Sequence, residues 1–186
     1  MNDLTELAEL IRARNAIDTL IARRVGRPAH IGHVGEFLAC AIFNIQLEES
    51  ATARAIDGRF VDGPLAGRTV NVKWFTKHDG LLDINEDTSL DYYLVFKGPK
   101  TPPASSRGAI APWVIEYVFL LDAQQLLENL RCRNVKIQRH GATGIASALW
   151  EQAEIYPVQR NITLMLTETQ RAQLALFSLT IPKAGT

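Results

Sequence analysis

The sequence has few of the features that mark exported or membrane-spanning proteins. Only two of its 186 residues are cysteines, Cys40 and Cys132, which excludes a disulfide framework and fits a reducing cytoplasm. No run of about eighteen uncharged apolar residues occurs, so we expect no membrane-spanning helix. The N-terminal region is acidic, at Asp3, Glu6 and Glu9, where a secretory signal would be basic and then apolar. These absences predict a cytoplasmic protein.

The chain also has no net charge, because its 20 basic and 20 acidic residues balance each other. Such a chain has no strong overall attraction to a phosphate polymer, so any contact with nucleic acid has to come from a local patch. Apolar residues, in contrast, make up 47% of the chain, enough to build a core at this length. No internal repeat or linker is found, and we predict one domain spanning residues 1–186.

Hydrophobic periodicity predicts four helices, over residues 3–26, 31–47, 123–133 and 167–179. The first ends at a stop signal made by Gly26 and Pro28. The last two begin at N-cap residues, Asp122 for one and Thr167 or Thr169 for the other. The second helix is apolar around most of its circumference, so we expect it to be packed on two sides.

A period of two, typical of strands, appears after the polar link at residues 48–55. Residues 55–75 predict a hairpin whose connecting loop is built on Asp62, Gly63, Pro64 and Gly67. Further strands are expected over residues 91–98, 113–121 and 134–138. Residues 98–112 predict a long exposed loop, and residues 140–157 show no regular pattern apart from a plain turn at Gly141 to Gly144. The order of elements predicts an α/β (α+β) fold with a central mixed sheet flanked by helices.

Three residues of this region, Glu36, Asp57 and Lys73, could take part in catalysis or metal binding, and each also has an ordinary structural explanation. Glu36 is the only carboxylate between Ile31 and Phe43; buried without a cationic partner it would be costly, but it could simply interact with the helix end or an arginine. Asp57 is followed by glycine, which is common in turns. Lys73 shares one strand face with Asn71, and a lysine on a strand is usually just solvated.

Because of the hairpin, Glu36, Asp57 and Lys73 are more informative together than each residue is alone. It brings Asp57 to within about a residue or two of the position opposite Asn71 and Lys73, with a register that depends on the loop. A helix bearing Glu36 precedes this hairpin. Two acids and a lysine are therefore expected to converge.

In this order of elements and residues, the chain resembles the PD-(D/E)XK (restriction-endonuclease-like) nuclease superfamily. In that superfamily a helix bearing Glu precedes a hairpin that carries Asp and then an acid-x-Lys triplet. The segments IGHVGEF, AIDGRF and TVNVKWF carry the resemblance, which covers roughly residues 31–97 and implies a core of about 31–135. The same stretch is similar to a family of bacterial proteins of unknown function that is assigned only to this fold.

The resemblance implies a Mg²⁺-dependent (or Mn²⁺-dependent) nuclease that cleaves phosphodiester bonds in DNA. Glu36, Asp57, Asn71 and the backbone carbonyl of Val72 would be the metal ligands, since hard oxygen donors suit Mg²⁺. The metal acidifies a water and offsets charge at the scissile phosphate. Lys73 would position or activate that water and stabilise the developing negative charge.

Asn71 departs from the family pattern, because an acid is expected there; Ile56, in place of proline, is a lesser departure. A carboxylate about 4 Å from a divalent cation gains roughly 8 kcal/mol of gross Coulomb energy at an effective dielectric near 20, and asparagine lacks this charge. Either Glu36 supplies the missing charge or the domain has lost cleavage. The alternative function is therefore an inactive module that binds nucleic acid or a protein partner. A third interpretation is a purely structural Glu36–Lys73 ion pair.

Contacts with a phosphate backbone are expected from basic side chains near this site. The candidates are His33, Lys77, His78, Lys97 and Arg107, of which the last two decorate the expected long loop. The alternative is that they lie on solvated faces balanced by acids. His30 and His33 lie three apart, but no second pair has the spacing of a zinc site. A homodimer is compatible with the sequence, which contains nothing that determines the oligomeric state.

Overall fold

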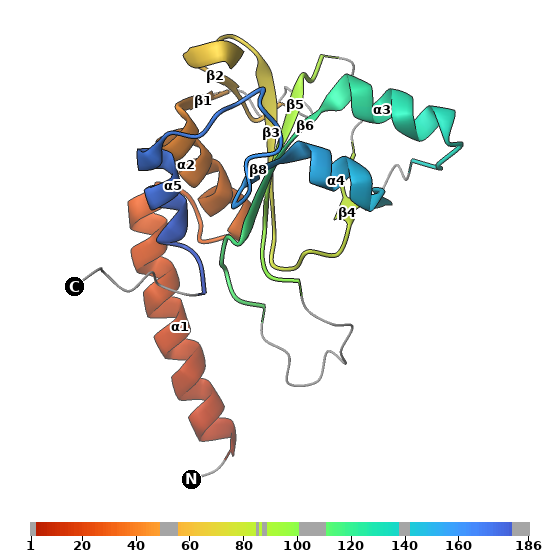
Figure 1. The fold of residues 1–186 in the computed structure, drawn as a ribbon. Helices are drawn as coiled ribbons and strands as arrows, with labels where there is room; N and C mark the ends of the chain where they lie inside the picture. Colours follow the sequence, from red (N-terminus) through yellow and green to blue (C-terminus); the bar gives the residue numbers. More distant parts are fainter. Residues whose placement is uncertain are drawn as a thin grey trace, which may run out of the picture.

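The computed structural model of the protein describes residues 3–48, 56–84, 86, 89–100, 111–137 and 142–179. A six-stranded sheet lies at its centre (Figure 1). In spatial order its strands are β1 (Ile45–Leu47), β2 (Gly58–Phe60), β3 (Thr69–Phe75), β5 (Tyr92–Lys97), β6 (Tyr117–Asp122) and β8 (Glu154–Tyr156). Neighbouring strands are antiparallel except β3 and β5, which are parallel, so the sheet is mixed.

Helices lie on both faces of this sheet. These are α2 (Ile31–Phe43), α3 (Ala123–Cys132), α4 (Ser147–Ala153) and α5 (Glu168–Ala175), while α1 (Asp3–Val25) projects away from the sheet. A 3-10 turn, η1 (Gly63–Leu65), lies between β2 and β3, and a two-stranded sheet is formed by β4 (Leu81–Leu82) and β7 (Thr143–Gly144). Helices α2 and α5 lie on one side of the sheet and α3 and α4 on the other (Figure 1). The predicted α+β class with a central mixed sheet flanked by helices is confirmed.

The core consists of two apolar clusters, one on each face of the sheet. Towards α2, the side chains of Val70, Val72 and Trp74 are buried against residues such as Leu38 and Ile42. Towards α3 and α4, the cluster contains Val95, Phe119, Leu126, Leu127 and Trp150. Because side chains alternate along a strand, Asn71 and Lys73 of β3 belong to this second face. The core also extends beyond residue 135, with Trp150, Ile155, Leu166 and Leu174 all buried.

Local sequence signals predicted several elements well. The hairpin is present as the antiparallel pair β2–β3. The Asp122 side chain accepts a hydrogen bond from the Gln125 backbone N–H at 2.8 Å and begins α3. Thr167 and Gln170 form a capping box at the start of α5. These elements were predictable because turn and cap signals act between residues close in the chain.

Other expectations were wrong. The helix expected over residues 31–47 ends at Phe43, because Asn44 adopts a left-handed conformation (φ 51°), and the residues that follow form β1. Residues 134–137, the described part of the fifth expected strand, form no strand. Residues 142–157, expected to be irregular, contain β7, α4 and β8, and Thr143–Gly144 pairs with β4 instead of making a plain turn.

Two further expectations concern the loop and the membrane. Of the loop expected over residues 98–112, residues 101–110 lie outside the part that the structure describes. Among the described helices, none is long and apolar enough to cross a membrane.

Candidate active site

Asp57 lies where β2 meets β3. Its backbone N–H donates to the Val70 carbonyl at 2.9 Å, and its carbonyl accepts from the Glu48 N–H at 2.9 Å. Since Gly58 is the partner of Val70 in the β2–β3 register, Asp57 lies opposite Asn71. The hairpin therefore brings Asp57 next to the Asn71-Val72-Lys73 triplet.

The Asp57 side chain reaches one residue further along β3. Its Oδ2 accepts a hydrogen bond from the Val72 backbone N–H at 2.7 Å. The N–H and C=O of one strand residue point to the same edge, so the Val72 carbonyl also faces the edge on which Asp57 lies. Strand β2 begins at Gly58, opposite Val70, and so does not pair with this part of β3. A carboxylate and a carbonyl oxygen thus meet at the far end of the β2–β3 pairing.

The electrostatic environment of Asp57 shows which charges gather around it. Burial raises the pKa of its carboxyl, the Val72 N–H lowers that pKa, and the Glu36 carboxylate raises it again. Lys73 and Arg27 both act to lower the same pKa. Glu36, Lys73 and Arg27 thus lie close enough to Asp57 to act on its carboxyl electrostatically.

Glu36 has a cationic partner, as the cost of its burial predicts. The partner is Arg27, whose Nη1 donates to Glu36 Oε2. Arg27 belongs to the short link between α1 and α2, where the His33 ring nitrogen Nδ1 also lies 2.9 Å from the Pro28 carbonyl oxygen. Among the described residues the ion pair of Glu36 is thus with Arg27, whereas the third interpretation required Lys73. An arginine partner for Glu36 was one of the expected alternatives, and the structure identifies it as Arg27, nine residues earlier in the chain.

The candidate site residues Glu36, Asp57, Asn71 and Lys73 lie on both faces of the sheet and at its edge. Asn71 and Lys73 lie beside Tyr93 and Val95 of β5, on the face covered by α3 and α4. Glu36 belongs to α2, which packs on the opposite face. Asn71 is buried and Lys73 is half-buried. Asp57 lies between these two faces, at the edge of β3 just beyond its pairing with β2.

The donors at this edge fit a magnesium ion by their chemistry. Carboxylate, carbonyl and amide oxygens are the ligands that Mg²⁺ takes, usually with several retained waters. Asp57, the Val72 carbonyl, Glu36 and Asn71 provide such oxygens. Within the described ranges, no group of three His, Cys, Asp or Glu residues could hold a metal. A cation here would therefore have two carboxylates at most, and Glu36 would have to exchange its arginine for the cation.

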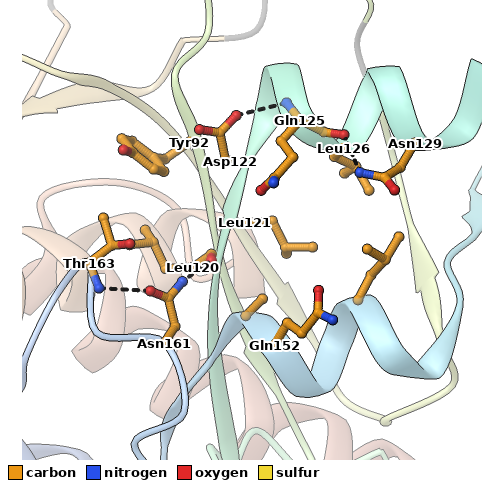
Figure 2. Close-up of a pocket in the computed structure, with 12 residues that line it drawn as sticks. Tyr92, Leu120, Leu121, Asp122, Gln125, Leu126, Asn129, Gln152, Asn161 and Thr163 are labelled. Carbon is orange, nitrogen blue, oxygen red and sulfur yellow. Dashed lines mark hydrogen bonds between the residues drawn. The ribbon is translucent and has the colours of Figure 1, made fainter.

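Cavities also lie elsewhere in the described part of the molecule. One of about 140 Å³ lies between α3, α4 and β6, and Figure 2 shows several of its polar side chains in structural hydrogen bonds. Asp122 caps α3, and the Asn161 amide binds the Leu120 carbonyl at 2.9 Å and the Thr163 N–H at 2.8 Å. Another, about 240 Å³, is lined by aromatic rings such as Tyr117 and Trp150 and by Lys100, Glu151 and Glu154, and it contains none of Glu36, Asp57 and Lys73. Chemistry therefore favours the β3 edge as the functional site.

Lys97 is not the exposed loop residue that the sequence suggested. It ends β5 with its side chain fully buried, where Nζ donates to the Leu81 carbonyl at 2.8 Å and lies 4.0 Å from the centre of the Trp150 ring. Asp79 Oδ1 is 3.4 Å from Nζ. A phosphate cannot reach this amine, and burial lowers its pKa to about 8. We therefore withdraw Lys97 as a phosphate contact.

The remaining basic candidates differ in their surroundings. Lys77 is exposed and His33 is half-buried. His78 packs edge-on against Tyr117, with ring centres 4.9 Å apart, and burial followed by Lys97 and Lys100 lowers its pKa, so it carries little charge at pH 7. Arg107 lies outside the described residues.

The burial of Lys97 predicts a pH dependence of stability. The folded-state pKa of about 8 lies below the ordinary 10.5, so between these values the unfolded chain binds more protons and stability rises with pH. The Lys97→Met variant has no such proton. From pH 7 to pH 9.5, the free energy of unfolding of wild type should rise by about 2 kcal/mol relative to this variant, measured by urea unfolding. A difference that does not change with pH would contradict the assignment.

Comparison with models of known protein families finds none that matches the chain, and comparison with curated proteins likewise finds no match.

Proposed function

We propose that this chain is a phosphodiesterase that depends on a divalent cation, Mg²⁺ or Mn²⁺, and acts on DNA in the cytoplasm. The observation that carries the proposal is the hydrogen bond of Asp57 to the Val72 backbone just beyond the β2–β3 pairing, within electrostatic reach of Glu36 and Lys73. The order of these groups in the chain is that of the PD-(D/E)XK superfamily, and DNA is the substrate class that this resemblance implies.

The residues divide into two roles. Asp57, the Val72 carbonyl and Glu36 would hold the cation, with Asn71 as a neutral ligand or orienting group. The cation acidifies a water and offsets charge on the phosphate when it is bound. Lys73 stands one residue beyond Val72, where its ammonium orients the water and stabilises negative charge that develops on the phosphate oxygens. Arg27, once released from Glu36, is free to bind the phosphate.

A specific observation favours a second candidate function, an inactive module of the same fold that binds nucleic acid or a protein. The Arg27–Glu36 ion pair already neutralises one of the two acids, and Asn71 offers no charge. A cation therefore has to displace a guanidinium in order to gain a second carboxylate. In an inactive module that displacement does not occur, and the ion pair simply joins the link after α1 to α2.

Calorimetric titration with Mn²⁺ separates the two functions. Asp57→Asn removes one charge but keeps an oxygen that accepts from the Val72 N–H, so the fold should persist. We expect wild type to bind Mn²⁺ and the variant to lose this binding. Because the fold raises the pKa of the Asp57 carboxyl, removing its charge should also raise the free energy of unfolding at pH 7.

The control is Asp83→Asn, which removes an exposed carboxylate outside the cluster. It should leave Mn²⁺ binding unchanged. Wild-type protein that binds no Mn²⁺, or binding that survives Asp57→Asn, would exclude the proposed metal site and favour the inactive module.

A further inference from the structure

Helix α1 presents an apolar surface that the other described residues of the protein do not bury. It has 23 residues, which corresponds to a length of about 35 Å, and none of them is buried. The helix projects from the body of the molecule, with its N-terminal end pointing away (Figure 1). Five large apolar side chains on it are between 50% and 63% exposed: Leu7, Leu10, Ile11, Ile17 and Leu20.

Five apolar side chains of α1 lie within an arc of about 120° around the helix axis, which Arg14 shares, and Leu20 lies outside it; the five are Leu7, Leu10, Ile11, Ile17 and Ile21. Leu10 and Ile17 are seven residues apart, as are Leu7, Arg14 and the half-buried Ile21. Spacings of three, four and seven place these side chains along one stripe, which is the pattern of a helix that packs lengthwise against another helix. Half-buried Ile21, Ala22 and Val25 show that the C-terminal end of α1 packs against the body, whereas the exposed part of the stripe gains nothing from tertiary packing, the main source of helix stability in proteins. The stripe therefore needs a partner.

The charges of α1 indicate the direction of that partner. The first third of the helix is acidic, at Asp3, Glu6 and Glu9, and its last turn is basic, at Arg23 and Arg24. A parallel copy would place acid against acid and base against base, whereas an antiparallel copy places acid against base at both ends. Charge complementarity thus favours a second copy of α1 in the antiparallel direction.

We propose that two copies of this chain associate through α1 as an antiparallel pair centred on Arg14. In this arrangement Leu7 lies opposite Ile21 of the partner, and Ile11 lies opposite the partner's Ile17. The two Arg14 side chains meet at the centre, each beside its own Asp18, whose Oδ2 is 3.4 Å from the Arg14 Nε. A single polar layer between two apolar clusters fixes the register of the pair.

A membrane surface fits α1 less well than a second copy does. Helices that lie on membranes carry an excess of Lys and Arg, which binds anionic lipid. In α1 the four arginines, at 12, 14, 23 and 24, balance the four acids, at 3, 6, 9 and 18, so the helix has no net charge.

The proposed helix pair has two-fold symmetry. Because the body of each chain follows the C-terminal end of its own α1, the two bodies lie towards opposite ends of the pair.

Sedimentation equilibrium of the full chain tests the association, from about 1 to about 100 μM. We expect a dimer in this range, and Leu10→Glu/Ile17→Glu should weaken it at least hundredfold, because four charges would enter the apolar stripe. The matched control is Thr5→Glu/Thr19→Glu, which adds the same charges on the opposite side of α1 and should leave the dimer in place. Since α1 has no buried residue, both variants should keep the thermal transition of wild type.

Charge exchange tests the direction. Glu6→Lys/Glu9→Lys places like charges together in an antiparallel pair and should weaken it about tenfold or more. Adding Arg23→Glu/Arg24→Glu to the same chain should restore it. In a parallel pair neither change alters association, so an unchanged dimer would overturn the antiparallel arrangement. A monomer throughout the concentration range would overturn the proposal, as would a monomer that binds phosphatidylcholine–phosphatidylserine vesicles through α1.

Discussion

Replacing Lys73 by alanine is expected to lower the rate of Mg²⁺-dependent or Mn²⁺-dependent DNA cleavage at least about a hundredfold. Negative charge develops on phosphate oxygens during hydrolysis, and removal of one preorganised donor at such a position costs about 10²–10³ in rate. Lys73 is half-buried on β3 and acts electrostatically on Asp57, which places it beside the proposed metal ligands. The measurement is cleavage of linear, supercoiled and single-stranded DNA by purified protein.

The matched control is Lys136→Ala, which removes an exposed lysine outside the charged cluster. Its cleavage rate should equal that of wild type, which would show that loss of a positive charge alone is not the cause. Cleavage by the Lys73→Ala variant at the wild-type rate would exclude Lys73 from the chemistry. Absence of cleavage by wild type on every DNA form would reject the nuclease proposal, while retained Mn²⁺ binding would show that the metal site still exists.

The Gly58→Ala substitution is expected to reduce the free energy of unfolding by about 3 kcal/mol. A Cβ at Gly58 would lie 2.4 Å from the Gln46 carbonyl oxygen and 2.9 Å from Ile45 Cγ2, both on the paired strand β1. Backbone cannot yield as a flexible side chain does, so β1 and β2 would have to separate. Because Asp57 directly precedes Gly58, the carboxylate would also shift from the Val72 N–H. Urea unfolding and Mn²⁺ titration measure the two effects.

Gly32→Ala serves as the comparison. Gly32 lies in α2, and a Cβ there would meet no atom within 4 Å. Alanine is favoured over glycine in a helix by about 1 kcal/mol, so this variant should be slightly more stable than wild type and bind Mn²⁺ normally. If Gly58→Ala were equally stable, the close approach of β1 and β2 would not be a constraint on the fold.

The status of Gly58 illustrates what a local pattern can and cannot say. In the sequence, Asp57-Gly58 is typical of a turn, yet in the structure Gly58 is inside β2. The glycine is required by the approach of β1, a strand that follows directly after α2 and had been expected to continue it. Such an approach involves residues twelve or more positions apart, and no local pattern contains it.

Strand β8 is another element that local sequence patterns did not predict. Strand β8 has only three residues and is held by pairing with β6, about 36 residues earlier in the chain. Its own sequence, Glu154–Tyr156, shows no distinctive alternation. The strands that were predicted, β5 and β6, are longer and rich in aromatic and β-branched residues. Elements whose stability comes from partners are therefore the ones that sequence patterns missed.

The sequence by itself determined the class of the fold, the hairpin that aligns Asp57 with Asn71, and the caps of α3 and α5, because these depend on periodicity and on neighbours in the chain. Tertiary structure alone decided that Glu36 pairs with Arg27, that Lys97 is buried under Trp150, and that α1 stands clear of the core. Burial and the choice of ionic partner depend on which distant residues fold against each other. The free energy of a charged side chain in the fold depends on its burial and on its ionic partner.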